Sequence, residues 1–79
     1  MEIITDKSIK YIDIMAKDIY IEYTNGDFEY LSFARTNNLI NKVKPHEFKY
    51  NCADSEKSIK FLNKLLTKYR TNGNTLILK

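Results

Sequence analysis

The chain has few of the residues that build metal sites, disulfides or flexible linkers: one cysteine, one histidine, one proline, two glycines and no tryptophan among 79 residues. A lone cysteine excludes an intramolecular disulfide and favours a reducing, intracellular setting, so we expect a cytoplasmic protein. One histidine and one cysteine are too few for a structural zinc site. His46 and Cys52 are also separated by roughly 20 Å if the segment between them is extended. We therefore expect neither a metal nor a cofactor.

Longer patterns are missing as well. No apolar run is long enough to span a bilayer, and no signal-peptide core is present. The sequence contains no glycine-rich phosphate loop, no nucleophile elbow and no HExxH motif, so we expect a protein that is not an enzyme. Without a linker-like stretch, residues 1–79 should form a single small domain.

Among the features that are present, the strongest is Asn25-Gly26, which lies between two alternating runs, Ile19–Tyr23 and Asp27–Phe33. This arrangement predicts a β-hairpin with a two-residue turn. Ile9–Met15 also alternates, and Ala16-Lys17 is expected to join it to the second strand by another two-residue turn. The chain should therefore begin with a β-meander.

The expected turns fix which side chains share a face. Tyr23 should oppose Phe28, and Ile21 should oppose Tyr30, on an apolar face that receives a helix. Glu22 should then oppose Glu29 on the other face, where two like charges destabilise the pair. This second face is expected to hold acidic and aromatic groups together: Tyr11, Asp13, Met15, Asp18, Tyr20, Glu22, Glu29, Leu31 and Phe33.

The rest of the chain predicts two helices and two further strands. A short helix is expected over Asn37–Val43, followed by a strand over His46–Cys52. A long amphipathic helix should be capped by Asp54 or Ser55 and should end at the Asn72-Gly73 cap. Its core-facing residues should be Ile59, Leu62, Leu65, Leu66 and Tyr69. A closing strand should span Thr75–Leu78, and Met1–Thr5 is either a strand or a leader. The fold class is α+β: an antiparallel sheet of four to five strands, with one long C-terminal helix and one short helix packed on it.

The acidic and aromatic face leads to the main functional hypothesis. We expect a small binding protein that contacts the basic surface of a host protein through Tyr11, Asp13, Tyr20, Glu22, Glu29 and Phe33. Acidic residues two apart on a strand lie about 6.6–6.8 Å apart, so a row of them would imitate phosphates. The abundance of Asn, Lys, Ile and Tyr indicates an AT-rich genome. A phage or mobile-element inhibitor of a nuclease or of an anti-phage defence complex, such as an anti-CRISPR protein, fits both observations.

Several alternatives stay open. The face can simply be solvated and partly covered by the short helix, form a homodimer, or hold a divalent cation with Asp13, Glu22 and Glu29. A net charge of +3 does not by itself indicate nucleic-acid binding. One side of the long helix is nevertheless basic, which makes a nucleic-acid-binding module the second functional hypothesis. Its candidate residues are Lys57, Lys60, Lys64 and Lys68.

Overall fold

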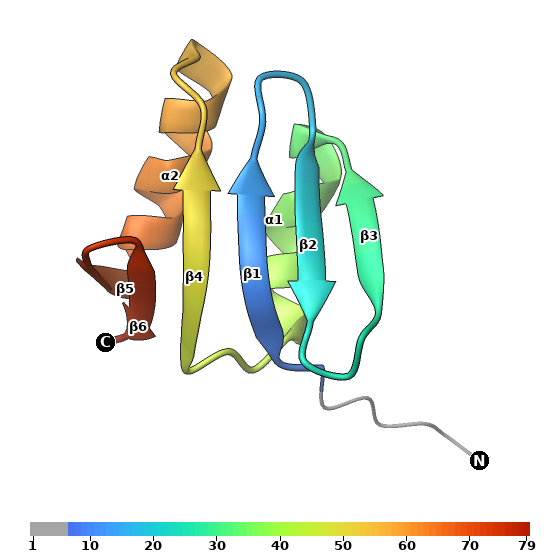
Figure 1. Cartoon of the computed structure of the whole chain (residues 1–79). Helices are drawn as coiled ribbons and strands as arrows, with labels where there is room; N and C mark the ends of the chain where they lie inside the picture. The colour runs from blue at the N-terminus through green and yellow to red at the C-terminus, as the bar shows by residue number, and fades with distance from the viewer. Residues whose placement is uncertain (1–6) are drawn as a thin grey trace.

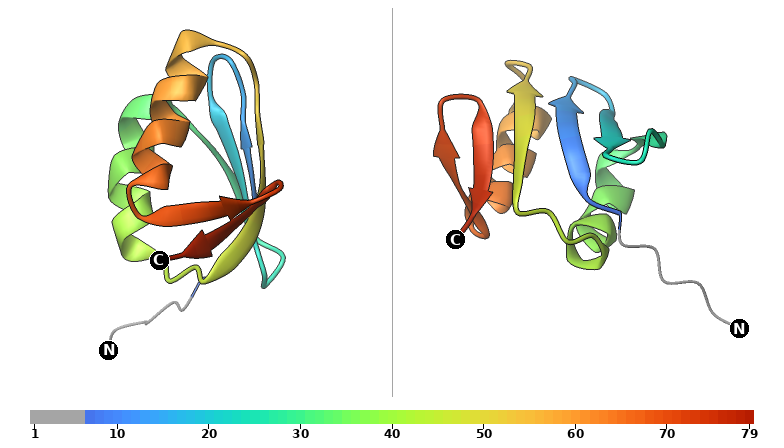
Figure 2. Two further views of the ribbon diagram at one scale, coloured as in Figure 1. Left: turned by 90° about the vertical axis from the view of Figure 1, so that its left-hand side faces the viewer. Right: turned by 60° about the horizontal axis from the view of Figure 1, so that its bottom comes forward.

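The computed structural model describes residues 7–79, except the side chains of Asn37 and Ile40; the segment Met1–Thr5, expected to be a strand or a leader, lies outside the described residues. A single sheet carries both helices on one of its faces, and its other face is open (Figures 1 and 2). The elements in chain order are β1 (Ile9–Ile14), β2 (Ile19–Tyr23), β3 (Phe28–Leu31), α1 (Phe33–Lys42), β4 (Glu47–Cys52), α2 (Glu56–Leu66), β5 (Tyr69–Asn72) and β6 (Thr75–Leu78).

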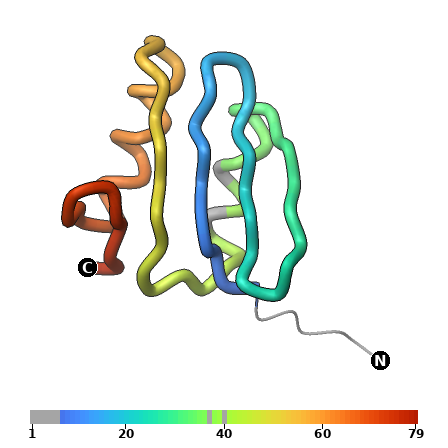
Figure 3. Tube along the Cα trace, in the orientation of Figure 1, coloured from blue at the N-terminus to red at the C-terminus, as the bar shows by residue number. Residues whose placement is uncertain are grey.

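The sheet has six strands in the order β3-β2-β1-β4-β6-β5, and it is mixed. The predicted antiparallel sheet of four to five strands is therefore wrong. The opening meander is antiparallel, but β4 pairs parallel to β1. The reason is α1, which carries the chain from the outer strand β3 back across the sheet, so that β4 arrives beside β1 in the same direction (Figure 3).

The predicted long C-terminal helix is also wrong, because α2 ends at Leu66 and the chain then enters the strand Tyr69–Asn72. Asn72 pairs with Thr75, which leaves a two-residue hairpin loop of Gly73 and Asn74. Gly73 has φ +65°, while no described residue other than glycine has a positive φ. That combination fits a type II′ turn, so Asn72-Gly73 starts a hairpin instead of capping a helix.

Helix α1 begins four residues earlier than predicted, at Phe33, with Ser32 at the N-cap position. Thr36, which precedes the predicted start of the helix, is fully buried inside it. Its hydroxyl group donates a 2.8 Å hydrogen bond to the carbonyl oxygen of Phe33, which satisfies the buried polar group.

Helix α2 has the predicted cap but a different buried face. Ser55 accepts a 3.2 Å hydrogen bond from the Ser58 N–H, as an N-cap residue should. Ser58, Phe61 and Leu65 are the buried residues of the helix, whereas Ile59, predicted to lie in the core, is 43% exposed. Ser58 also donates a 2.8 Å bond to the carbonyl oxygen of Met15, which ties α2 to the first hairpin. The helix is therefore rotated towards this polar anchor.

The first hairpin has the predicted register, with Ile14 opposite Ile19 and Ile12 opposite Ile21. The second hairpin does not. Tyr23 donates a 2.8 Å hydrogen bond to the carbonyl oxygen of Asp27, and a three-residue loop closes with Gly26 at φ +96°. This geometry is typical of a type I turn followed by a bulged glycine. An Asn-Gly pair suits this three-residue loop as well as it suits a two-residue turn.

One additional loop residue reverses the two faces of β3. Phe28 and Tyr30, predicted to be buried, lie on the open face and are 61% and 62% exposed. Leu31 is buried on the helix-covered face instead. The largest fully buried side chains come mainly from the strands β1 and β2, and the others from α2, β5 and β6: Ile12, Ile14, Ile19, Ile21, Tyr23, Leu65, Tyr69 and Leu76.

Candidate functional site

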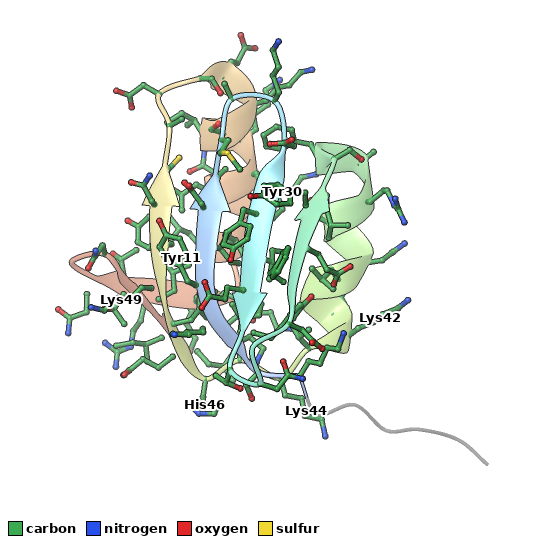
Figure 4. The ribbon with its side chains drawn as sticks, turned by 45° about the vertical axis from the view of Figure 1, so that its right-hand side comes forward. Tyr11, Tyr30, Lys42, Lys44, His46 and Lys49 are labelled. Atoms are coloured by element: carbon green, nitrogen blue, oxygen red, sulfur yellow. The ribbon has the colours of Figure 1, made fainter. Side chains whose placement is uncertain are left out.

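The open face of the sheet orders its side chains into two cross-strand rows. In the first row the strand pairing places Asn51, Asp13, Tyr20 and Tyr30 next to one another, from β4 to β3. In the second row it places Lys49, Tyr11, Glu22 and Phe28 in the same order. Figure 4 labels Tyr11, Tyr30 and Lys49 on this face. We call these eight residues the open-face grid.

Three rings of the grid form an aromatic cluster at the outer side of the sheet. The ring centroid of Tyr20 lies 5.1 Å from that of Tyr30 and 6.0 Å from that of Phe28. Phe28 and Tyr30 meet edge to face, with centroids 6.4 Å apart. Aromatic pairs at these separations stabilise one another, but more than half of the Phe28 and Tyr30 surfaces stays in water. An exposed cluster of this kind marks an interaction surface more often than a solitary exposed ring does.

Carboxylates alternate with these rings. Glu22 accepts a 3.0 Å hydrogen bond from the Tyr20 hydroxyl and lies 3.3 Å from the Lys10 ammonium nitrogen. These two contacts lower the pKa of Glu22, so the carboxylate stays charged at neutral pH. Desolvation and the same carboxylate raise the pKa of Tyr20, which keeps its hydroxyl protonated. Asp13 accepts a 3.1 Å bond from the Asn51 amide, which orients it within its row.

Four of the six predicted partner-binding residues lie on the open face: Tyr11, Asp13, Tyr20 and Glu22. Glu29 and Phe33 do not. Glu29 lies on the helix-covered face and accepts a 2.7 Å hydrogen bond from the buried hydroxyl of Tyr23. The ring of Phe33, at the start of α1, packs edge to face on that of Phe61, with centroids 6.2 Å apart.

The predicted opposition of Glu22 and Glu29 is therefore wrong, because Glu22 pairs with Phe28. The regular row of carboxylates that would imitate phosphates is not formed. The proposed cation site of Asp13, Glu22 and Glu29 fails for the same reason, since Glu29 lies on the other face. Among the described residues no group of three or more His, Cys, Asp or Glu side chains is arranged to hold a metal ion.

Sequence reasoning missed Phe28 and Tyr30 as members of the site. Their alternation with Glu29 and Leu31 was visible in the sequence. Which of the two sets lies on the open face, however, depends on the length of the loop around Gly26. A three-residue loop was an available reading of Asn25-Gly26, because a bulged glycine has the same sequence preference. The Asn25 side chain accepts a 2.9 Å bond from the Asp27 N–H, a local contact typical of asparagine in turns.

A groove of about 520 Å³ borders the grid where β1 and β4 diverge. The two strands begin to pair only at Tyr11 and Lys49, so their preceding residues separate, as Figure 1 shows. The buried side chains of Ile9 and Phe48 belong to this groove. The full lining is Ile9, Lys10, Tyr11, Glu22, Thr24, Glu47, Phe48, Lys49 and Thr75. The grid thus combines a ring cluster at one side with a recess at the other.

The predicted lysine stripe is divided between two places. Lys57, Lys60 and Lys64 line a groove of about 380 Å³ between the two helices, with Phe33 and Phe61. Lys68 follows the end of α2 and lines a different groove, together with Lys44 and His46. His46 and Cys52 lie at opposite ends of β4, as predicted, since His46 precedes the strand and Cys52 ends it. Burial raises the pKa of the Cys52 thiol.

No known protein family, no curated protein and no solved structure gives a significant match to this chain. Within residues 7–79, neither helix is long and apolar enough to cross a membrane.

Proposed function

We propose that this protein is a binding module without enzymatic activity, and that its open-face grid binds a basic surface of another protein. The single observation that carries the proposal is the exposed aromatic cluster of Tyr20, Phe28 and Tyr30, with the carboxylates of Asp13 and Glu22 beside it. The exposed faces of the rings and the charged carboxylates both attract cations.

Arginine is the side chain that this arrangement fits best. Its guanidinium group stacks flat on an aromatic ring while its N–H groups donate to a carboxylate in the same plane. In the first row of the grid, Asp13 is the cross-strand neighbour of Tyr20, so one partner side chain can reach both groups. In the second row, Glu22 has Tyr11 on one side and Phe28 on the other, which offers the same combination.

An inhibitory role follows if the basic surface of the partner has a polyanionic ligand of its own. A module bound to that surface would then exclude the ligand, because it would occupy the cationic side chains of the partner. Enzymes that bind nucleic acid, including nucleases of host defence systems, have such surfaces. The proposed mechanism is competition for arginine side chains, and it does not need a regular row of phosphate mimics.

The proposal is tested by NMR titration of the labelled protein with an arginine-rich peptide, with a peptide of glycine and serine as the negative control. We expect chemical-shift changes concentrated at Asp13, Tyr20, Glu22 and Tyr30. Glu22→Lys should weaken binding at least tenfold without unfolding the protein, whereas the matched charge reversal Glu56→Lys on α2 should leave binding unchanged. Shifts confined to other surfaces, or equal weakening by both variants, would refute the proposal.

A second candidate function is nucleic-acid binding by the helical layer, and one observation favours it. Helix α1 carries two basic and no acidic residues, and α2 carries three basic and one acidic, a net charge of +4 against +3 for the whole chain. The groove between the helices adds the half-buried ring of Phe33 to three of these charges, whereas the ring of Phe61 is buried. Bases stack on exposed rings while lysines contact phosphates, which is the usual combination for single strands.

This second candidate predicts a gel shift of single-stranded DNA or RNA that weakens as salt increases. The double variant Lys60→Glu, Lys64→Glu should abolish the shift, and Lys49→Glu on the open face should preserve most of it. A wild-type protein that gives no shift at low salt would exclude this function and leave the first proposal intact.

A further inference from the structure

Strand β3 is an unprotected edge of the sheet. It is the outermost strand beside β2, and no described element pairs with its other side (Figure 1). Its sequence, Phe-Glu-Tyr-Leu, contains neither the lysine nor the proline with which soluble proteins protect exposed edges. The opposite edge strand β5 differs, because after Tyr69 it continues with Arg70 and two polar residues. Of the two edge strands in the described part of the chain, β3 is the one that combines an open edge with apolar side chains.

The backbone groups that face outward from this edge belong to Phe28 and Tyr30. The hydrogen bond from Tyr23 N–H to the Asp27 carbonyl marks those two residues as a hydrogen-bonded pair. Such pairs alternate along an antiparallel ladder, so Glu29 and Leu31 also direct their backbone groups towards β2. The N–H and C=O groups of Phe28 and Tyr30 therefore point to the outside of the sheet, where an added strand would meet them.

The two sides of this edge specify what an added strand should carry. On the open face it would lie beside the rings of Phe28 and Tyr30, which favour apolar or aromatic neighbours. On the helix side it would meet a groove of about 370 Å³ between β3 and α1. Arg35 and Lys42 give this groove positive charge, and Figure 4 shows Lys42 on α1. The remaining lining residues are Glu29, Leu31, Ala34, Asn38 and Leu39.

Strand β3 itself carries the side chains that such an added strand needs: aromatic rings on its open face, and a carboxylate and a leucine on its helix-covered face. We propose that a second copy of this chain adds its β3 antiparallel to the first, related by a twofold axis, and continues the sheet. The Glu29 carboxylate of each copy then lies towards the Arg35 side chain of the other. The rings of both copies share the common open face. This self-complementarity of shape, apolar surface and charge favours a second copy over an unrelated strand.

Charge also selects the register of the pairing. If Phe28 opposed Tyr30 of the second copy, Glu29 would oppose Glu29 of that copy. If Phe28 opposed Phe28 of the second copy, Glu29 would oppose Asp27 of that copy. Both registers bring carboxylates together, which destabilises a sheet. With Tyr30 opposite Tyr30 of the second copy, Glu29 opposes Leu31 instead. This register avoids the repulsion and keeps every residue on its proper face.

The dimer does not depend on the proposed function, but it extends the same surface. The open faces of the two copies lie on one side of the continued sheet, so the two aromatic clusters become neighbours. A partner with two basic sites would then bind with increased avidity. The interface includes only four residues of each strand, together with the groove beside α1, so we expect reversible association at high concentration.

The test combines sedimentation velocity over a concentration series with amide hydrogen exchange. We expect a monomer–dimer equilibrium, and amides of Phe28 and Tyr30 that become protected at least tenfold as concentration rises. The amides of Glu29 and Leu31, already bonded to β2, should not change. A monomer at millimolar concentration, or a dimer in which Phe28 and Tyr30 exchange at unchanged rates, would overturn the proposal.

Charge variants give a second readout. Arg35→Glu should weaken dimerisation at least fivefold by placing a carboxylate towards Glu29 of the other copy. The matched control Lys57→Glu, in the first turn of the other helix, makes the same charge change away from the edge and should leave the dimer unaltered. Circular dichroism and thermal unfolding of each variant establish that it is folded. If both variants weaken the dimer equally, β3 is not the interface.

Discussion

The hydrogen bond between Tyr23 and Glu29 tests the register that defines the open-face grid. The Tyr23 ring is 1% exposed, and its hydroxyl lies 2.7 Å from a Glu29 carboxylate oxygen. In the register expected from a two-residue turn, these side chains would lie on opposite faces and would not meet. Tyr23→Phe removes only the hydroxyl, so the variant leaves no cavity for the ring.

A hydrogen bond to a charged acceptor contributes about 1.5–3 kcal/mol to stability. Glu29 is half-buried, and its contact with solvent places the expected cost of Tyr23→Phe near the lower limit, at about 1.5 kcal/mol. For a domain of this size, each 1 kcal/mol lowers the melting temperature by about 4–8 °C. Urea unfolding followed by circular dichroism measures the free energy, and thermal scans provide an independent value.

A double-mutant cycle isolates the interaction from the general effect of each substitution. We expect a coupling energy of about 1 kcal/mol between Tyr23→Phe and Glu29→Leu, which removes the acceptor. The matched cycle of Tyr23→Phe with Glu22→Leu should be additive, because Glu22 lies on the open face. Additivity in the first cycle, or coupling only in the second, would refute the register and with it the membership of Phe28 and Tyr30 in the site.

The remaining predictions concern pH, the turn and the helix. Because the pKa of Glu22 is lower in the folded protein, its carboxylate contributes fully to stability at pH values above the unfolded pKa of about 4.3. This stabilisation is lost only as the pH falls through the lower folded pKa, which carboxyl NMR titration measures. Binding of the arginine-rich peptide should therefore persist at about pH 5. Gly26→Ala should destabilise the protein by about 1–2 kcal/mol in urea unfolding, since φ is +96° there. Leu65→Ala should cost about 2–5 kcal/mol, and Ile59→Ala less than about 1 kcal/mol, because Leu65 is fully buried and Ile59 is 43% exposed.

The strands of the opening meander were predictable from the sequence because alternation and turn residues are local signals. Residues 9–14 and 19–23 form strands as expected, and their register follows from the Ala16-Lys17 turn. The cap at Ser55 was equally local. The pairing of β4 with β1 was not predictable in this way, because it depends on the path of α1 across the sheet.

In the C-terminal half of the chain, two errors arose where a local signal had two valid readings. Asn72-Gly73 terminates helices and also starts hairpins, and the choice depends on whether Tyr69 continues a helix or pairs with Leu78. The apolar stripe of α2 was equally ambiguous. Ser58 was not among the residues expected in the core, but it is buried and bonded to Met15 and Ser55, and in this orientation of the helix Ile59 is turned outward.

The exposed rings of the grid exist because of a balance between two registers of β3. A two-residue turn would bury Phe28 and Tyr30, each worth about 1.5–3 kcal/mol, but it would expose Leu31 and place Glu22 opposite Glu29. The three-residue loop buries Leu31 and satisfies the hydroxyl of Tyr23 with Glu29. The two gains offset the exposure of two aromatic side chains, but they do not require those side chains to be aromatic, since a polar residue at either position would solvate better. Serine or threonine on the open face of β3 would keep this register but lose the ring contacts with Tyr20, whereas the rings stabilise one another and still stay more than half exposed, as the interaction surface proposed above requires.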